Sequence, residues 1–130
     1  MDRDLIERYA LDTRYHGLIN DHQGIGRCEE PGCGDVLEVT LKTEREIITE
    51  IGYIITATAC PPMKACAGIM AEMAMGKPVM AAYLITHADI GAHAGGLEKE
   101  SEHCAMMAEL ALKRSIIDYA RRRKQAQKQH

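Results

Sequence analysis

The stretch DVLEVTLKTEREIITEIGYIITATA, residues 35–59, carries the clearest structural signal in this sequence. Polar and apolar residues alternate over 35–42, so Leu37, Val39 and Leu41 would share one face of a β-strand. A strand with one apolar face buries that face against the rest of the protein. The sequence therefore predicts a half-buried strand at this point.

The same stretch predicts a second strand that pairs antiparallel with the first. Residues 43–46 are polar and indicate a turn, and residues 47–59 are rich in the β-branched side chains that favour strands. Gly52 lies inside this run and is expected to mark a bulge. The side chains expected on one side of the strand are Ile47, Ile51, Tyr53 and Ile55.

Helical spacing begins after Pro61-Pro62, a pair that suits a helix start. Apolar residues then recur at the spacing of one helix face, at Met63, Ala67, Met70 and Ala74. Gly76 is expected to end this helix. Two short helices are expected over 78–85 and 86–94.

A long final helix is expected to begin at Ser101, whose hydroxyl suits a helix N-cap. Its apolar stripe consists of Ala105, Ala108, Leu112, Ile116 and Tyr119. The basic tail, 121–130, is interpreted as the solvated end of that helix, with a docking patch for an acidic partner as the alternative.

Upstream of the strands, the N-terminal segment 1–11 predicts a short helix over 2–11, and the five glycines of 12–34 indicate a loop. A third strand is expected either from 12–34 or from a division of 47–59. Strands followed by helices predict an α+β fold: a small antiparallel sheet of about three strands with helices packed on one face. The length predicts a single domain over 1–130.

Composition narrows the functional class. The net charge is −3 and the only aromatic residues are five Tyr, so the chain has no overall basic surface and few of the aromatic platforms that nucleic-acid-binding proteins use. No signal segment and no apolar run long enough for a membrane helix is seen, which favours a cytoplasmic protein. Five cysteines without a secretion signal argue for metal ligands or reactive thiols rather than disulfides.

Three cysteines lie where a loop meets a strand or helix. Cys33 stands between two glycines with Asp35 following, Cys60 precedes Pro61-Pro62, and Cys104 follows His103 near the start of the last helix. A thiolate at a helix N-terminus is favoured by the helix dipole and by free N–H groups.

Such cysteines suit a soft metal or an iron–sulfur cluster. Three thiolates with Asp35 or His103 as a weaker fourth ligand would suit a metal ion or cluster that is bound only temporarily and then released. Buried structural cysteines and nucleophilic catalysis are the alternatives, although His103 and Cys104 are neighbours that rarely face each other in a helix. Cys66 is expected to be a buried thiol, and Cys28 an exposed spare thiol in the glycine loop.

The three cysteine blocks resemble those of the IscU/NifU scaffold family. Residues 31–36, Pro-Gly-Cys-Gly-Asp-Val, resemble the family's P-x-C-G-D-V signature. Cys60, with Gly76-Lys77 closing the next helix, and residues 102–109, Glu-His-Cys-Ala-Met-Met-Ala-Glu, resemble its second and third blocks. The blocks stand in the family's order from about Cys28 to Tyr119.

The resemblance implies a scaffold, not an enzyme, on which a [2Fe-2S] cluster is assembled from iron and from sulfur delivered by a cysteine desulfurase. The cluster then passes to acceptor apoproteins. Its ligands would be Cys33, Cys60 and Cys104, with Asp35 and His103 as auxiliary groups, and Cys104 would also accept the persulfide. An iron or electron donor and a homodimer are further implied partners. The alternative is a zinc-binding, SufU-like sulfur-relay protein, which generally lacks the His and carries an insertion that this chain does not have.

The sequence departs from the family pattern at three places. Ala59 replaces the usual Gly before the second cysteine, and Pro61-Pro62 replace the Gly-Ser after it. Residues 11–14 stand where the family has Asn-Pro-Arg-Asn. Residues 96–100 replace the segment recognised by a dedicated Hsp70 chaperone, so the resemblance does not carry chaperone-driven release over to this chain.

Overall fold

The computed structural model describes residues 2–32 and 34–128. It contains a sheet of three antiparallel strands, β1 (Gly24–Glu29), β2 (Val36–Glu44) and β3 (Ile47–Ile55), in the order β1-β2-β3. The helices are α1 (Arg3–Ala10), α2 (Pro61–Ala74), α3 (Val79–Tyr83), α4 (His87–His93) and α5 (Glu102–Lys128), with a 3₁₀ turn, η1 (Lys99–Ser101), before α5. This is the α+β fold that the sequence predicts.

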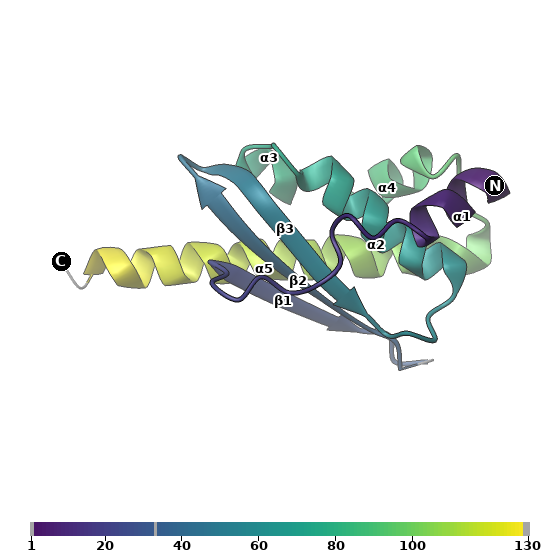
Figure 1. Ribbon diagram of the computed structural model, residues 1–130, viewed down its shortest axis with the longest axis horizontal. Coiled ribbons are helices and arrows are strands. Elements are labelled where there is room, and N and C mark those ends of the chain that lie inside the picture. The colour runs from purple at the N-terminus through teal and green to yellow at the C-terminus, as the bar shows by residue number, and fades with distance from the viewer. Residues whose placement is uncertain (1, 33, 129–130) are drawn as a thin grey trace.

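The long helix α5 lies along the sheet, and α2 lies beside it (Figure 1). The expected strand face, Leu37, Val39 and Leu41, is fully buried beneath these helices. The apolar faces predicted for α2 and α5 are also buried: Met63, Ala67, Met70, Ala74, Ala105, Ala108, Leu112, Ile116 and Tyr119. The core therefore lies between the sheet and the helices.

The third strand comes from 12–34, one of the two segments expected to supply it, although the glycines there also indicated a loop. Gly24–Glu29 pairs with β2 in register from Gly24 opposite Leu41 to Glu29 opposite Val36. Of the two origins expected for a third strand, 12–34 is confirmed, and within that segment these six residues are strand rather than loop. The role of the glycines is packing: a Cβ on Gly24 would lie 2.9 Å from the Tyr119 Cβ of α5, and one on Gly26 would lie 2.7 Å from the Arg114 carbonyl carbon. The two glycines allow α5 to lie directly on β1.

The predicted bulge at Gly52 was also wrong. The register of β2 with β3 shifts between Lys42 and Thr43, and this shift buries Ile48 rather than the expected Ile47. Gly52 instead makes room for the chain before β1. The Gly17 N–H donates to the Tyr53 carbonyl at 2.8 Å, so this part of the chain lies against the edge of β3.

The rest of that edge is covered by the residues after α2. The Ile48 N–H donates to the Lys77 carbonyl at 2.9 Å, and the Gly76 N–H donates to the Ile48 carbonyl at 3.0 Å. Gly76 has a φ of 82°, the left-handed conformation expected of a helix-ending glycine. The Gly-Lys pair noted in the sequence thus docks α2 onto the sheet edge.

The N-terminal helix is held by a polar network. The Tyr9 hydroxyl donates to the Glu72 carboxylate and lies 3.0 Å from His93 Nε2, and Arg14 pairs with Glu72 at 2.9 Å. These contacts join α1 to α2 and α4. No helix among the described residues is long and apolar enough to cross a bilayer.

Candidate functional site

The first loop of the candidate site joins β1 to β2. The Glu30 N–H donates to the Asp35 carbonyl and the Gly34 N–H donates to the Glu30 carbonyl, each at 2.8 Å, so the loop closes on itself. Gly34 has a φ of 75°, a conformation that few residues other than glycine adopt. Asp35 is half-buried at the end of the loop. Cys33, predicted as a ligand, lies outside the described residues.

The second loop, between β3 and α2, is tied to the first. The Val36 N–H donates to the Thr56 hydroxyl at 2.8 Å, and the Thr56 N–H donates back to the Val36 carbonyl at 3.1 Å. These bonds hold Thr56, at the start of the loop that leads to Cys60, beside Val36, which follows Asp35. Sequence reasoning missed Thr56, whose only signal was a hydroxyl at the end of an apolar strand.

Cys60 is the N-cap residue of α2 and its side chain is exposed. Its carbonyl accepts hydrogen bonds from the N–H groups of Met63 and Lys64, at 3.0 and 3.1 Å. The first two helix positions are Pro61 and Pro62, which have no N–H, and the Cys60 side chain makes no capping hydrogen bond. The expected support from free N–H groups is therefore reduced at this cysteine, because proline removes two of the donors.

Cys104 is the third residue of α5, as expected, and it is fully buried. Ser101 is the last residue of the 3₁₀ turn that runs directly into α5. The Cys104 Sγ lies 3.6 Å from Nε2 of the exposed His103. The expectation that these neighbours do not face each other was wrong, because at the first turn the imidazole reaches back to the sulfur.

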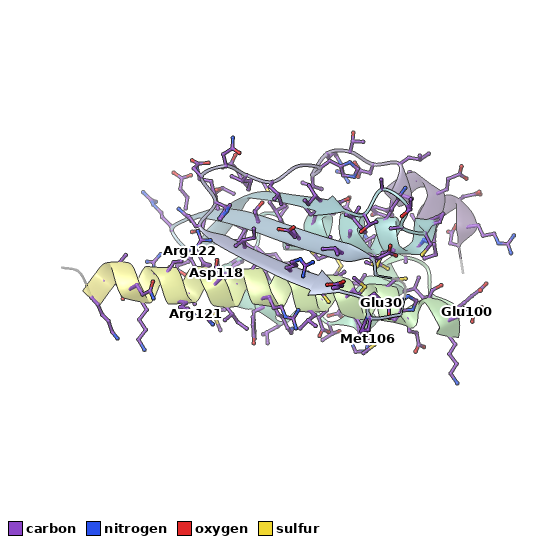
Figure 2. All side chains as sticks on the ribbon, turned by 90° about the horizontal axis from the view of Figure 1, so that it is seen from below. Glu30, Glu100, Met106, Asp118, Arg121 and Arg122 are labelled. Atoms are coloured by element: carbon purple, nitrogen blue, oxygen red, sulfur yellow. The ribbon has the colours of Figure 1, made fainter. Side chains whose placement is uncertain are left out.

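The crossing of β1 and α5 sets the position of the third cysteine block. Gly24 lies against Ser115 and Tyr119, whereas Gly26, further along β1, lies against Ala111 and Ser115. The chain of β1 therefore runs toward the start of α5 as it approaches the Glu30 loop. Figure 2 shows Glu30 and Met106 at one end of α5, with Asp118 and Arg122 at the other.

The described residues of the three cysteine blocks thus lie toward the same end of the sheet. Among the described residues, Asp35 and Cys60 stand on loops joined through Val36 and Thr56, and His103 and Cys104 stand on the first turn of α5. Within residues 2–32 and 34–128, no group of three or more His, Cys, Asp or Glu side chains is placed to hold a metal ion. The predicted ligand set remains a prediction.

The two additional cysteines lie in the core. Cys66 is buried in α2 as expected; burial, with a further contribution from the nearby Cys60, raises the pKa of its thiol to about 12. Cys28 was expected to be exposed, and that was wrong: it lies on the inward side of β1 and is buried. Burial raises the pKa of the Cys28 thiol. Neither thiol is exposed enough to be a ready nucleophile.

Glu109, the last residue of the third motif, has a structural partner. Its carboxylate accepts a hydrogen bond from the His87 N–H at 2.6 Å and lies 3.2 Å from the His87 Nδ1. Glu109 therefore holds the N-terminus of α4 against α5. His87 and His93 are exposed.

Residues 2–126 match the model of the family described as NifU-like N terminal domain. The chain is 32% identical over 122 residues to "Iron-sulfur cluster assembly scaffold protein IscU 1" of Archaeoglobus fulgidus, covering 94% of this chain and 78% of that one. It is 31% identical over 113 residues to the IscU scaffold protein of Aquifex aeolicus, covering 85% of this chain and 71% of that one.

Solved structures share the fold. A putative iron–sulfur cluster assembly scaffold protein for the SUF system from Fervidobacterium islandicum aligns with a TM-score of 0.70 at 14% identity, over 87% of this chain and 94% of that one. A NifU-like protein (N-terminal) from Brucella abortus aligns with a TM-score of 0.69 at 15% identity, over 90% of this chain and 92% of that one.

Proposed function

Because the chain belongs to the NifU-like N-terminal domain family, we propose that it is a scaffold on which an iron–sulfur cluster is assembled and from which it passes to acceptor proteins. The observation that carries the proposal is the placement of the cysteine blocks. The described Cys60 and Cys104 stand at the starts of α2 and α5, toward the sheet end where the Glu30–Asp35 loop closes. A scaffold of this kind binds its cargo and catalyses no turnover of its own.

The ligands proposed for the cluster are Cys33, Cys60 and Cys104. Thiolates are the preferred ligands of iron–sulfur clusters, whereas a carboxylate or an imidazole is a weaker partner. Asp35 or His103 in the fourth position would leave one exchangeable corner, which suits a [2Fe-2S] cargo that has to depart. The exposure of Cys60 would let an acceptor thiol reach the cluster from solvent.

Single Cys→Ser variants test this set. Each is reconstituted anaerobically with iron and sulfide, and the cluster is followed by its visible absorption and Mössbauer spectrum. Loss of the cluster is expected in all three variants. Cys66→Ala is the matched control, because Cys66 is buried one helix turn and a half beyond Cys60 and should keep a full cluster. A stable full cluster in any of the three Ser variants would remove that residue from the set.

Cys104 is proposed as the sulfur acceptor. Its sulfur would attack the outer sulfur of a desulfurase persulfide, forming a new S–S bond while the desulfurase cysteine leaves as a thiolate. Because Cys104 is fully buried, the first turn of α5 has to open for this transfer, and His103 at 3.6 Å can take up the Cys104 proton. Mass spectrometry after desulfurase treatment should find one added sulfur on Cys104 first. A persulfide formed first on the exposed Cys60 would refute this assignment.

A zinc-binding sulfur-relay protein is the second candidate. It is favoured by one comparison, the SUF-system protein that shares the fold. Metal analysis of anaerobically purified protein separates the two functions, since stoichiometric zinc without a coloured species would support the relay. The proposal also includes a single domain over 1–130 and a cytoplasmic location. The proposed partners are a cysteine desulfurase, an iron or electron donor and a second copy of the chain.

A further inference from the structure

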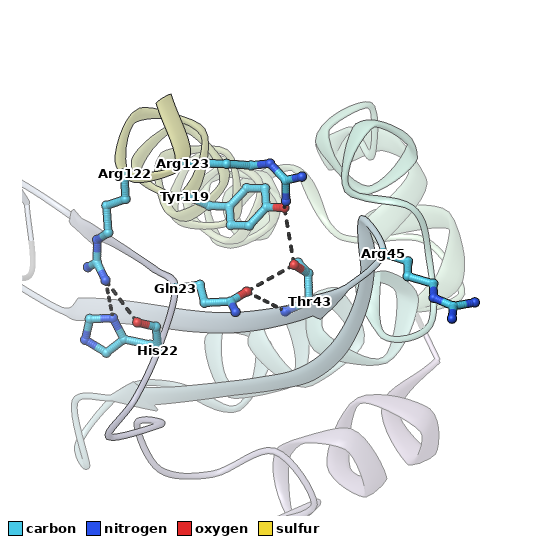
Figure 3. A pocket seen from close by; sticks show the side chains of 7 residues that line it. All are labelled: His22, Gln23, Thr43, Arg45, Tyr119, Arg122 and Arg123. Carbon is cyan, nitrogen blue, oxygen red and sulfur yellow. Dashed lines mark hydrogen bonds between the residues drawn. The ribbon is translucent and has the colours of Figure 1, made fainter. Parts of the chain in front are cut away.

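A hollow of about 410 Å³ lies between the β2–β3 hairpin, the chain just before β1 and the second half of α5. Three arginines, Arg45, Arg122 and Arg123, line it together with His22, Gln23 and Tyr119, and no carboxylate does (Figure 3). Its volume lies in the range of small-molecule sites. The chain thus has a cavity with a strongly basic lining on an otherwise acidic protein of net charge −3.

Two of the arginines are held in position by carboxylates that lie outside the lining. Arg122 pairs with Asp118 at 2.8 Å and donates to the His22 carbonyl at 3.0 Å. It also lies 3.1 Å from His22 Nδ1, which must be the acceptor because a guanidinium has only donors. Such anchored guanidinium groups lose little conformational entropy when they bind a further group.

The second anchored arginine, Arg123, pairs with Glu46 at 2.6 Å and donates to the Tyr119 hydroxyl at 3.0 Å. Gln23 contributes a neutral donor: its Oε1 accepts from the Thr43 N–H at 2.8 Å and from the Thr43 hydroxyl at 3.0 Å. This contact orients the side-chain amide, so that its NH₂ group remains to serve a ligand. The lining therefore combines fixed positive charge with an oriented neutral donor.

The third arginine, Arg45, makes no hydrogen bond or ion pair with any described residue. It is the first residue of the two-residue turn between β2 and β3, and both turn residues have a positive φ, 53° for Arg45 and 68° for Glu46. Turns of this kind favour Asn-Gly, and a longer side chain in that conformation costs about 1 kcal/mol or more. The strained turn places Arg45 at the rim of the cavity, where its guanidinium points away from Arg122 and Arg123 and has no partner among the described side chains (Figure 3).

We propose that this cavity is a binding site for a small multivalent oxyanion, a molecule with two or more adjacent phosphate or carboxylate groups. Guanidinium groups bind both kinds of oxyanion through paired N–H donors, so the lining selects for adjacent negatively charged oxygens rather than for phosphate or carboxylate in particular. Tyr119 is only 5% exposed, so it leaves little ring surface on which an aromatic ligand could stack. The concave shape favours a small molecule over an acidic partner surface. The site lies at the opposite end of α5 from Cys104 and does not depend on the proposed scaffold function.

The test uses the metal-free chain, residues 1–130, labelled with ¹⁵N and titrated with pyrophosphate and, separately, with citrate. Amide shifts are expected to concentrate at His22, Thr43 and Arg45. The exposed Arg45→Gln variant should weaken binding about tenfold, and Arg122→Gln should do the same. Arg3→Gln, an equal charge loss on the exposed surface of α1, should leave the affinity unchanged. Binding of pyrophosphate alone or citrate alone would identify the ligand as a phosphate or as a carboxylate.

Three outcomes would overturn the proposal. Shifts spread over the surface, or equal weakening by Arg3→Gln and Arg45→Gln, would indicate nonspecific attraction. Saturable binding of an oligoglutamate peptide, with neither small anion bound at about 10 mM, would make this face a docking surface for an acidic protein. An unchanged affinity in both Arg45→Gln and Arg122→Gln would place the anion elsewhere.

Discussion

Replacing Gly26 by Ala should push α5 away from the sheet and disturb the proposed cluster site at the start of α5. The added Cβ would lie 2.7 Å from the Arg114 carbonyl carbon and closer still to the Ser115 nitrogen and the Ala111 oxygen. All three are helix backbone atoms, so no side chain can turn away and α5 itself has to move. Clashes in a packed core cost about 1–3 kcal/mol, and this one belongs at the upper end.

A loss of about 3 kcal/mol corresponds to a fall in Tm of about 10 °C for a chain of this length. Chemical and thermal denaturation of the reduced apo-protein measures both. Gly91→Ala is the matched control, because its Cβ would meet only the Leu97 side chain, at an ordinary 3.7 Å, and the helical position of Gly91 favours Ala by up to about 1 kcal/mol.

The displacement of α5 should also weaken cluster binding, since α5 carries Cys104. Reconstituted Gly26→Ala protein is expected to lose its cluster faster than wild type in air, whereas Gly91→Ala should match wild type. If Gly26→Ala unfolded within about 0.5 kcal/mol of wild type, the close contact of α5 with β1 would not be a constraint, and the role assigned to the glycine would be refuted.

Three further predictions concern single side chains. Burial raises the pKa of Tyr53 to about 12, so the folded state holds the phenol proton more tightly than the unfolded chain does. The free energy of unfolding should therefore be unaffected below about pH 10 and should fall between about pH 10 and 12. Urea titrations should show a smaller fall for Tyr53→Phe. Glu72→Gln should weaken the contacts of residue 72 with Tyr9, Arg14 and His93, cost about 1 kcal/mol of stability and speed amide hydrogen exchange in α1. Exchange that is slower or unchanged would contradict the role of this network. Asp35→Ala should slow cluster transfer to an apo-ferredoxin by removing the exchangeable ligand; transfer as fast as wild type with faster decay in air would leave His103 as the fourth ligand.

Local pattern was enough to predict much of this protein. The alternation over 35–42 predicted β2 because a half-buried strand leaves a period of two in its own residues. The helical spacing from Met63 and along α5 predicted both buried faces for the same reason. The three cysteine blocks predicted the family, since metal and cluster sites need particular residues in particular local contexts, and that prediction is confirmed by the family match over residues 2–126.

Contacts between distant residues decided what the pattern could not. Gly24 and Gly26 indicated a loop until α5, about ninety residues later, supplied the surface against which only glycines fit. The same packing buried Cys28, and the register shift near Lys42 exchanged Ile48 for Ile47 in the core. The His103–Cys104 contact and the arginine cavity likewise depend on where helices end and cross. The periodicity of a segment shows which side chains share a face of a helix or strand. Only the tertiary structure supplies the neighbour that determines whether that face is buried, paired or open to a ligand.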